Sequence, residues 1–252
     1  MNDWDEIIQL AAGYCGDISQ KRVLDIGCDT EGYAIEAMAT RFHALEAVGV
    51  NLKTSNRILP KGCQLVRADV RNLPFPDNYF DFIFSTSAFE HITDLDLALN
   101  EMHRVLKPGG QLFTHFGPIW STSYGHHLWF DFQGKTYTYW NVHLPAFCHL
   151  LQTPQEIYEM LLADHPSEVS EAIVNYVFDS GEQNKLFFDD YEQLFRDSKF
   201  QITFFKGYDY PELSRVYTKS ITPSTIRQLK SRYPRISGFL YDGIVAVLRK
   251  VN

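Results

Sequence analysis

The sequence predicts an α/β fold in which a mostly parallel sheet is covered by helices on both faces. Short apolar runs that suit buried strands alternate with longer segments of helical periodicity. The strand candidates are not joined as tandem hairpins, so strands of one direction are expected to be connected through helices. A glycine turn follows the first strand candidate, at the edge of the sheet where such folds bind ligands.

The segment 22–33 is the centre of this arrangement. Residues 23–26 form the apolar strand, Gly27 ends it at a sharp turn, and a helix begins near Glu31. We expect the backbone N–H groups of this turn and of the helix N-terminus to point outward unpaired. They would then receive an anionic or carboxylate-bearing ligand.

The remaining elements follow from apolar periodicity and from capping signals. Thr93 with Asp96 resembles a capping box, and Thr153-Pro154-Gln155-Glu156 is a strong helix start. The leading helix covers either an edge of the sheet or a ligand site. We expect, in chain order, helix 3–15, strand 23–26, helix 31–43, strands 47–50, 64–68 and 79–84, helix 95–106, strand 111–116, a helical lid from 154 to 177 broken near 165–166, helix 187–195, strand 201–205, helix 223–233 and strand 243–249.

Composition narrows the class of protein. The chain has 252 residues, of which 45% are hydrophobic and 21% charged, as in globular proteins. Its aromatic share of 15% leaves rings available for a pocket or an interface. The formal net charge is −8 with no run of Lys or Arg, so a nucleic-acid partner is not expected.

The cysteines and the N-terminal residues indicate the cellular compartment of the protein. Cys15, Cys28, Cys63 and Cys148 form no CxxC pair, so neither a disulfide framework nor a zinc knuckle is expected, and the spacing of the histidines supports no metal site either. The N-terminus lacks a signal-peptide core, and no apolar run is long enough to span a bilayer. We therefore expect a cytoplasmic protein without a membrane partner, and a homodimer is one of the assemblies open to it.

Five motifs, in order along residues 20–117, resemble the class I S-adenosylmethionine-dependent methyltransferases, in their small-molecule branch. They are Val-Leu-Asp-Ile-Gly-Cys at 23–28, Ala-Asp-Val-Arg-Asn-Leu-Pro-Phe-Pro-Asp at 68–77, Tyr-Phe-Asp-Phe-Ile at 79–83, Phe-Glu-His-Ile at 89–92, and Arg-Val-Leu-Lys-Pro-Gly-Gly at 104–110. The resemblance implies a Rossmann-like, seven-stranded sheet and S-adenosylmethionine as cofactor. It also implies a single methyltransferase domain over 1–252, with a substrate-lid insertion at 118–188.

The resemblance further implies which residues bind the cofactor. Asn51 would face the ribose, Asp69 the adenine amino group with Val70 beside it, and Ser85 the region of the methyl donor. The loop beneath the methionine part would be shaped by residues of the first motif and the helix start, namely Asp25, Gly27, Cys28 and Gly32.

Three positions depart from the family pattern. Asp29 and Glu31 stand where the family more often has glycine, and Asn51 replaces the usual acid. Carboxylates at 29 and 31 would crowd or repel the cofactor's own carboxylate unless they turn outward. We therefore expect weaker cofactor binding than is usual in the family.

The insertion after the strand at 111–116 is expected to form the acceptor pocket. Trp120, Tyr124, Trp129 and His143 are candidate substrate-binding residues. For a hydroxyl or ammonium acceptor the protein must align acceptor and methyl group and remove a proton, and histidine suits this base. The first candidates are His126 and His127, followed by His91 and then His143.

Two functions remain open at this point. The first is an enzyme that methylates oxygen or nitrogen of a small-molecule metabolite or natural-product intermediate. The alternative is a non-catalytic relative that kept the fold as a binding or partner protein, for which the altered loop and Asn51 are the argument.

Overall fold

The computed structural model describes residues 3–209 and 221–251. Its contacts divide the chain into two compact units. The first unit comprises Met1–Phe116, Glu192–Lys206 and Val245–Asn252, and the second Gly117–Tyr191 and Gly207–Ile244. The second unit includes the range 118–188 and also residues 207–244. A single domain with an insertion over 118–188 stays a prediction.

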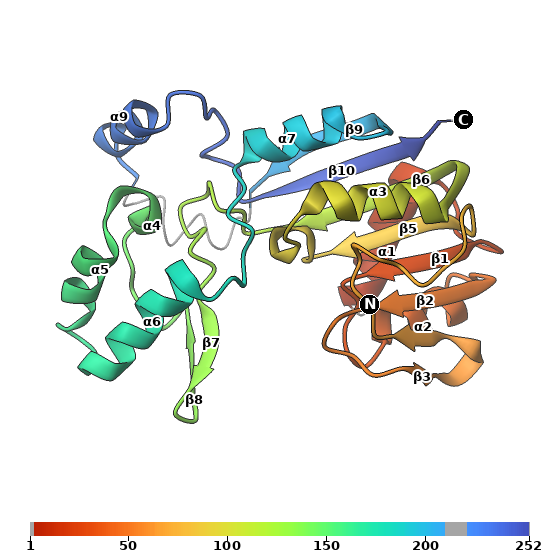
Figure 1. Ribbon diagram of the computed structural model, residues 1–252, viewed down its shortest axis with the longest axis horizontal. Helices are drawn as coiled ribbons and strands as arrows, with labels where there is room; N and C mark the ends of the chain where they lie inside the picture. The colour runs from red at the N-terminus through yellow and green to blue at the C-terminus, as the bar shows by residue number, and fades with distance from the viewer. Residues whose placement is uncertain (1–2, 210–220, 252) are drawn as a thin grey trace. The chain divides into compact units, whose positions relative to one another are not determined.

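The first unit is built on a large sheet, which has eight strands within the described residues, in the order β3-β4-β2-β1-β5-β6-β10-β9 (Figure 1). β1 pairs in parallel with β2 and β5, β2 with β4, and β5 with β6. The strands are β1 (Arg22–Ile26), β2 (Glu46–Val50), β3 (Arg57–Ile58), β4 (Gln64–Val66), β5 (Phe80–Thr86), β6 (Leu106–Phe116), β9 (Phe200–Tyr208) and β10 (Gly243–Lys250).

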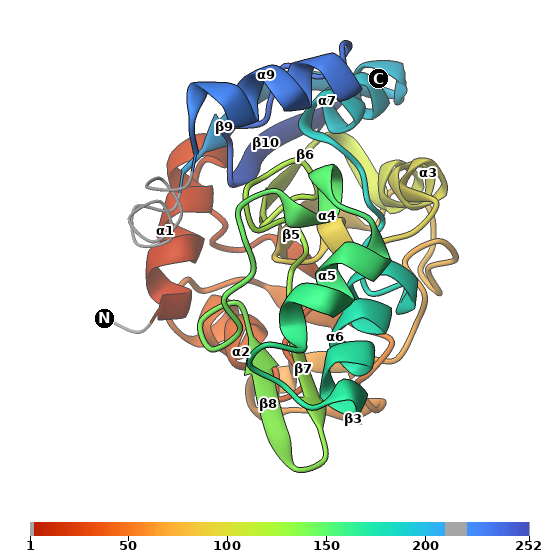
Figure 2. The same ribbon diagram turned by 90° about the vertical axis from the view of Figure 1, so that its left-hand side faces the viewer.

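Helices cover both faces of this sheet, and α1 and α3 lie on opposite faces (Figure 2). This arrangement confirms the predicted α/β Rossmann-like class. The described helices are α1 (Asp3–Cys15), α2 (Tyr33–Thr40), η1 (Pro60–Gly62), η2 (Phe89–His91), α3 (Leu95–Val105), α4 (Cys148–Leu151), α5 (Pro154–Leu161), α6 (Ser167–Asp179), α7 (Phe188–Asp197) and α9 (Pro223–Arg232).

The sheet has one strand more than predicted. β3 is only two residues long and runs antiparallel to β4 at the edge, which is too short for a periodic signal. The second unit also contains an unpredicted hairpin of β7 (Trp129–Phe132) and β8 (Lys135–Thr138). Gln133 and Gly134 join its strands with φ angles of 50° and 75°, as a two-residue turn of two left-handed residues requires.

The helix starts were predicted with mixed success. Thr153 and Glu156 form the expected capping box of α5, with Pro154 at its first position. The capping box predicted at Thr93 is wrong, because α3 begins after Asp94, whose φ is 50° and whose side chain makes no capping bond.

Arg104 on α3 joins two of the motifs. Its guanidinium donates to the carbonyl oxygens of Leu73 and Phe75 and to the carboxylates of Asp77 and Glu101, at 2.7–2.9 Å. Two carboxylates and two carbonyls satisfy the planar donor set of one arginine. This explains why the Leu-Pro-Phe-Pro-Asp loop and the Arg-Val-Leu-Lys-Pro-Gly-Gly segment occur together.

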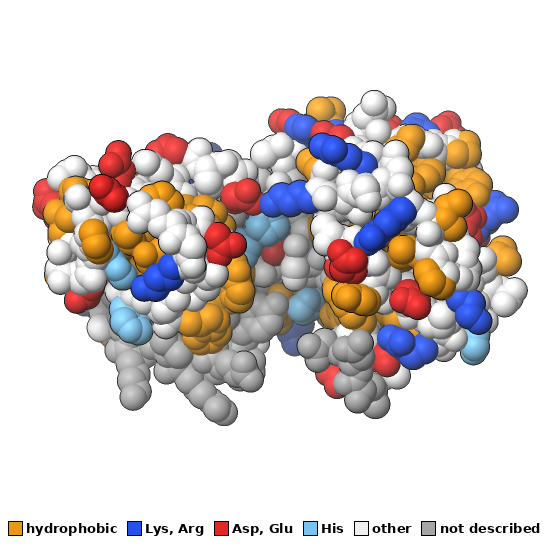
Figure 3. Space-filling model, turned by 90° about the horizontal axis from the view of Figure 1, so that it is seen from below, with side chains coloured by type: hydrophobic (Ala, Val, Ile, Leu, Met, Phe, Trp, Pro, Cys, Tyr) orange, Lys and Arg blue, Asp and Glu red, His pale blue; other side chains and the backbone are white. Residues whose placement is uncertain are grey.

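Charged side chains are interspersed on the surface. On the face seen in Figure 3, lysine and arginine stand among acidic and apolar side chains without forming one basic patch. Among the described helices, none combines the length and the apolarity needed to cross a bilayer.

Candidate active site

The turn after β1 is held by its backbone and requires glycine. The N–H groups of Gly27 and Cys28 donate to the carbonyl of Val50, at 2.9 and 3.2 Å, and so attach the turn to the end of β2. Gly27 has φ +77°, and a Cβ there would lie 2.3 Å from the Cβ of Ala88. A side chain at this position would therefore force the turn to move.

Asp29 occupies the N-terminus of α2. One carboxylate oxygen accepts the N–H groups of Glu31, Gly32 and Tyr33 at 3.1, 2.6 and 3.0 Å, and the other accepts that of Ala34 at 3.1 Å. The prediction that these N–H groups point outward unpaired is wrong, because the chain supplies its own anion to the positive end of the helix.

Glu31 is paired as well. Its carboxylate lies 3.2 Å from the Arg57 guanidinium on β3, which also donates to the carbonyl of Thr30. The Glu31 side chain is 57% exposed, so this ion pair lies at the surface. Both carboxylates that replace glycine are therefore held by partners within the loop and its neighbours.

Asn51 follows β2 and braces the same turn. Its amide nitrogen donates to the carbonyl of Cys28 at 2.7 Å, and its oxygen accepts the N–H of Lys53 at 2.8 Å. An amide makes up to four hydrogen bonds, so one N–H and one lone pair remain for a ligand. Gly32, with φ +83°, lies where a Cβ would be 2.4 Å from Leu59.

Asp69 follows β4 and is bound to Arg71. Its carboxylate accepts from the Arg71 side chain, with the shortest distance 2.7 Å, and from the Arg71 backbone N–H at 2.9 Å. These hydrogen bonds lower the pKa of Asp69. Arg71 also pairs with Asp94 at 2.7 Å, an interaction that the sequence did not suggest. Val70 beside Asp69 is buried.

Cys28 and Ser85 lie beneath the turn. The Ser85 hydroxyl is fully buried and donates to the carbonyl of Ile26 at 2.9 Å, joining the ends of β5 and β1. Cys28 is 2% exposed, and a Cβ at Gly49 would lie 2.7 Å from its sulfur. Burial raises the pKa of the Cys28 thiol. Both side chains are therefore buried and help to hold the turn in place.

The buried carboxyl group of Asp25 makes the unfolding free energy of the protein depend on pH. Burial, and then the nearby charge of Asp29, raise the pKa of Asp25 well above its usual range. The folded chain holds this proton to a higher pH than the unfolded chain, so Asp25 lowers stability increasingly as pH rises above about 4. We expect the difference in unfolding free energy between Asp25→Asn and wild type to increase from pH 4.5 to pH 7.5, measured by urea denaturation. An equal difference at both pH values would contradict this.

The histidine candidates are divided between the units. His91 ends η2 in the first unit. His126 and His127 belong to the second unit and precede β7, and His127 has φ 47°. His143 is exposed in the segment between β8 and α4.

His126 lies in a buried environment that the sequence did not predict. It is 2% exposed, and its Nδ1 accepts the N–H of Leu128 at 3.3 Å. Its ring centroid lies 5.8 Å from that of His149, whose Nε2 bonds the carbonyl of Trp120 at 2.8 Å. Burial lowers the pKa of both, that of His149 to about 4, so both imidazoles are neutral at physiological pH. His149 had no sequence signal, because it stands alone in a short apolar segment.

The aromatic side chains that are predicted to bind the substrate differ in their solvent exposure. Tyr124 is completely buried in the core of the second unit, and Trp120 is 8% exposed. Trp129 on β7 is 56% exposed. The ring of Tyr139 lies 5.9 Å from that of Tyr124 and 6.0 Å from that of Trp129. Tyr124 is thus a core residue, whereas Trp129 offers a surface ring.

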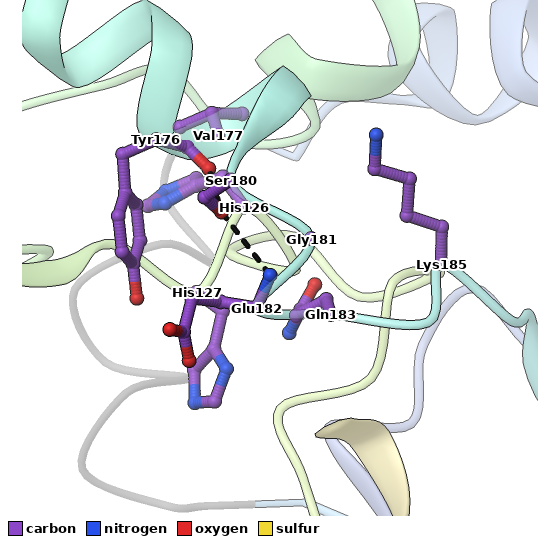
Figure 4. Close-up of a pocket in the computed structure, with 9 residues that line it drawn as sticks. All are labelled: His126, His127, Tyr176, Val177, Ser180, Gly181, Glu182, Gln183 and Lys185. Atoms are coloured by element: carbon purple, nitrogen blue, oxygen red, sulfur yellow. Dashed lines mark hydrogen bonds between the residues drawn. The ribbon is translucent and has the colours of Figure 1, made fainter. Parts of the chain in front are cut away.

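A pocket opens beside the two histidines within the second unit (Figure 4). Tyr176 and Val177 reach it from α6, and the following loop forms another wall, with the N–H of Glu182 donating to the Ser180 hydroxyl at 3.2 Å. The lining residues are His126, His127, Tyr176, Val177, Ser180, Gly181, Glu182, Gln183 and Lys185.

Comparison with known proteins points to one family. A family model described as "Methyltransferase domain" matches residues 24–114, the range that contains the Gly27 turn, Asn51 and Asp69. The chain is 30% identical over 182 residues to the ubiquinone/menaquinone biosynthesis C-methyltransferase UbiE of Neisseria meningitidis serogroup A. That alignment covers 70% of this chain and 66% of the relative, so the chain spans just under two thirds of the relative's length.

Two further similarities agree. The chain is 36% identical over 109 residues to the malonyl-[acyl-carrier protein] O-methyltransferase of Halorhodospira halophila, covering 40% of this chain and 37% of that protein. The solved structure of geranyl diphosphate C-methyltransferase from Streptomyces coelicolor A3(2) matches with a TM-score of 0.56 and 14% identity, covering 98% of this chain and 79% of that one. At that identity the structural likeness shows a shared fold.

Proposed function

Because the chain belongs to the class I S-adenosylmethionine-dependent methyltransferases, we propose that it transfers the methyl group of S-adenosylmethionine to oxygen or nitrogen of a small-molecule acceptor. The relatives named above are carbon and oxygen methyltransferases. The name of the Halorhodospira halophila relative and the sequence-based prediction both include an oxygen acceptor, so this is the form of the proposal that we favour.

One observation carries the cofactor part of this proposal. Asp25, Asn51 and Asp69 lie in or after β1, β2 and β4, which are adjacent parallel strands, and the Gly27 turn adjoins them. The carboxyl ends of parallel strands share one edge of the sheet, which is where α/β folds bind nucleotides.

The residues at this edge fit a nucleoside sulfonium. Asn51 retains one N–H and one lone pair for the ribose hydroxyls, after its bonds to Cys28 and Lys53. Asp69 is partly exposed, and three N–H groups of Arg71 occupy about three of the four acceptor sites of its carboxylate, so about one site remains for the adenine amino group. Asp29 and Glu31 are bound elsewhere and leave no unpaired carboxylate in the turn.

When bound, the cofactor supplies an already activated methyl group. The protein then has to align the acceptor and accept its proton. Of the pair His126 and His127, we assign proton removal to His127. In its neutral form His126 carries its proton on Nε2, because Nδ1 accepts the N–H of Leu128, so His127 is the better placed of the two to act as base.

Titration calorimetry with S-adenosylmethionine tests the proposal. We expect binding with a micromolar dissociation constant and competition by S-adenosylhomocysteine. Absence of binding at millimolar cofactor would contradict the proposal. Binding without methyl uptake by any acceptor in a metabolite screen would favour the alternative, a non-catalytic binding or partner protein.

The base assignment gives a separate prediction. We expect His127→Ala to lower turnover by about 10²-fold or more without a matching change in cofactor affinity, because a positioned base contributes that much. Steady-state rates and calorimetry on the same preparations measure both quantities. His43→Asn is the control, since His43 is exposed and has a left-handed backbone that asparagine tolerates. Unchanged turnover in His127→Ala would move the assignment to His91 and His143.

A further inference from the structure

Arg71 holds the Asp69 carboxylate in one orientation through three N–H groups. Oδ1 of Asp69 accepts the Arg71 backbone N–H at 2.9 Å, and Nε of Arg71 lies 3.1 Å from both carboxylate oxygens. Nη2 of Arg71 donates to Oδ2 at 2.7 Å. Because a forked guanidinium pair and a backbone N–H bind the same carboxylate, it cannot rotate without breaking hydrogen bonds to a charged partner.

The guanidinium of Arg71 is itself fixed from its other end. Nη1 donates to the Asp94 carboxylate at 2.7 Å and to the Thr93 hydroxyl at 3.2 Å. Thr93 and Asp94 directly precede α3, so Arg71 connects the loop after β4 to the start of α3 within the first unit. A planar guanidinium that donates through Nε, Nη1 and Nη2 has its plane fixed by these partners.

These hydrogen bonds leave about one acceptor site on the Asp69 carboxylate. An ionised carboxylate offers about four such sites. Among the described residues, the backbone N–H and Nε of Arg71 take the two sites of Oδ1, and Nη2 takes one site of Oδ2. The remaining lone pair therefore belongs to Oδ2. The Asp69 side chain is 33% exposed, so the carboxylate is accessible to a ligand.

Arg71 also keeps Asp69 in the state that accepts hydrogen bonds and does not donate them. The hydrogen bonds from the Arg71 side chain lower the pKa of Asp69. The carboxylate is therefore ionised at neutral pH and carries no proton. Such a group favours a base edge that donates, as the amino group of adenine does. It disfavours a carbonyl oxygen at the same place, because two acceptors would then face each other.

We propose that Arg71 is a positioning residue that orients the Asp69 carboxylate toward the nucleobase and so makes the cofactor site select adenine over hypoxanthine. Hypoxanthine carries a carbonyl oxygen where adenine carries its amino group. This inference rests on the proposed function in one respect, the assignment of Asp69 to the adenine amino group. Arg71 acts through Asp69 and not by contact with the base.

Calorimetry with S-adenosylhomocysteine and S-inosylhomocysteine tests this role, because the two compounds differ at the base alone. We expect wild type to bind the adenosyl compound about 100-fold more tightly or better, since the site would pair the amino group and repel the carbonyl. Arg71→Met removes the guanidinium donors and keeps an unbranched side chain. We expect it to reduce this affinity ratio by about 10-fold or more, the value of a hydrogen bond to a charged group.

Two further variants make the result specific. Asp94→Ala removes one anchor of Arg71 and leaves Arg71 paired with Asp69, so its affinity ratio should lie between those of wild type and Arg71→Met. Arg22→Met is the matched control. Arg22 begins β1, at the opposite end of the parallel strands from Asp69, and forms an ion pair with Glu46 at 3.4 Å. This control should keep the affinity ratio of wild type.

Carbon NMR of the Asp69 carboxyl group gives a readout that needs no cofactor. We expect Asp69 to titrate at lower pH in wild type than in Arg71→Met, because the guanidinium hydrogen bonds that lower its pKa are lost in the variant. A change that only loosened the fold would not shift this titration in the same direction. Equal titration midpoints in the two proteins would overturn the inference.

The outcomes separate this inference from the proposed function. If wild type binds S-adenosylhomocysteine and Arg71→Met leaves the affinity ratio unchanged, the inference alone is overturned. If wild type binds neither compound, the proposed function is refuted and the role of Arg71 with it. If Arg71→Met fails to fold, as its melting curve will show, Asp94→Ala decides the question, and a wild-type ratio in that variant overturns the inference.

Discussion

Replacing Gly27 with valine abolishes binding of S-adenosylmethionine. The new Cβ would lie 2.3 Å from the Cβ of Ala88, and the φ of +77° is one that a β-branched residue does not adopt. The turn must therefore move away from the end of β2, where two N–H groups now hold it. Calorimetry should detect no binding at 1 mM cofactor, a loss of at least 100-fold.

Two companion variants make this result specific. Gly13→Ala on α1 should bind normally, because a Cβ at Gly13 meets nothing within 4 Å. Gly27→Ala should bind more weakly than the double variant Gly27→Ala, Ala88→Gly, in which the clashing methyl group has been removed. Unchanged affinity in Gly27→Val would show that the cofactor does not use this turn.

Replacing Asp29 with alanine weakens both the fold and cofactor binding. Four N–H groups at and just before the start of α2 lose their acceptor, and loss of an acceptor at a helix N-terminus costs up to about 2 kcal/mol. The turn between Gly27 and Gly32 loses its anchor, so we expect at least 10-fold lower affinity for S-adenosylmethionine. Urea denaturation and calorimetry measure the two effects.

The control for Asp29 is Asp17→Ala, since among the described residues the Asp17 carboxylate accepts one hydrogen bond, from the N–H of Ser19 at 2.9 Å. This variant should change neither stability nor affinity by a comparable amount. Asp29→Gly tests the opposite view, in which the carboxylate only blocks a place that the cofactor's carboxylate could take. Tighter binding by Asp29→Gly would support that view and contradict ours.

Much of the fold was readable from the sequence because the buried strands carry strong apolar runs. Residues 23–26 and 47–50 pair in parallel as expected, and the break near His165 separates α5 from α6. The elements that were not predicted are short. β3 has two residues, and the hairpin turn uses Gln133 with Gly134, a weaker signal than Asn-Gly.

The sequence predicted the site residues that directly follow a strand. It did not predict the interaction partners that distant parts of the chain supply. Asn51 and Asp69 follow β2 and β4 as predicted, whereas their roles toward a cofactor stay predictions. The hydrogen bonds of Asp29 were not predicted, because the preference of aspartate for the N-terminus of a helix competes with the repulsion expected from its charge. The partnership of Arg71 with Asp94, and the burial of His149 beside His126, depend on tertiary packing that no local pattern records.

The reactivity of the buried Cys28 thiol can be used to measure how often the Gly27 turn opens. Thiol reagents attack the thiolate, and this sulfur is 2% exposed with a pKa raised by burial, so the closed protein should resist alkylation at this position. Modification then requires the segment above the sulfur to open transiently. The alkylation rate of Cys28 therefore reports how often this segment opens. A ligand bound over the segment should lower that rate.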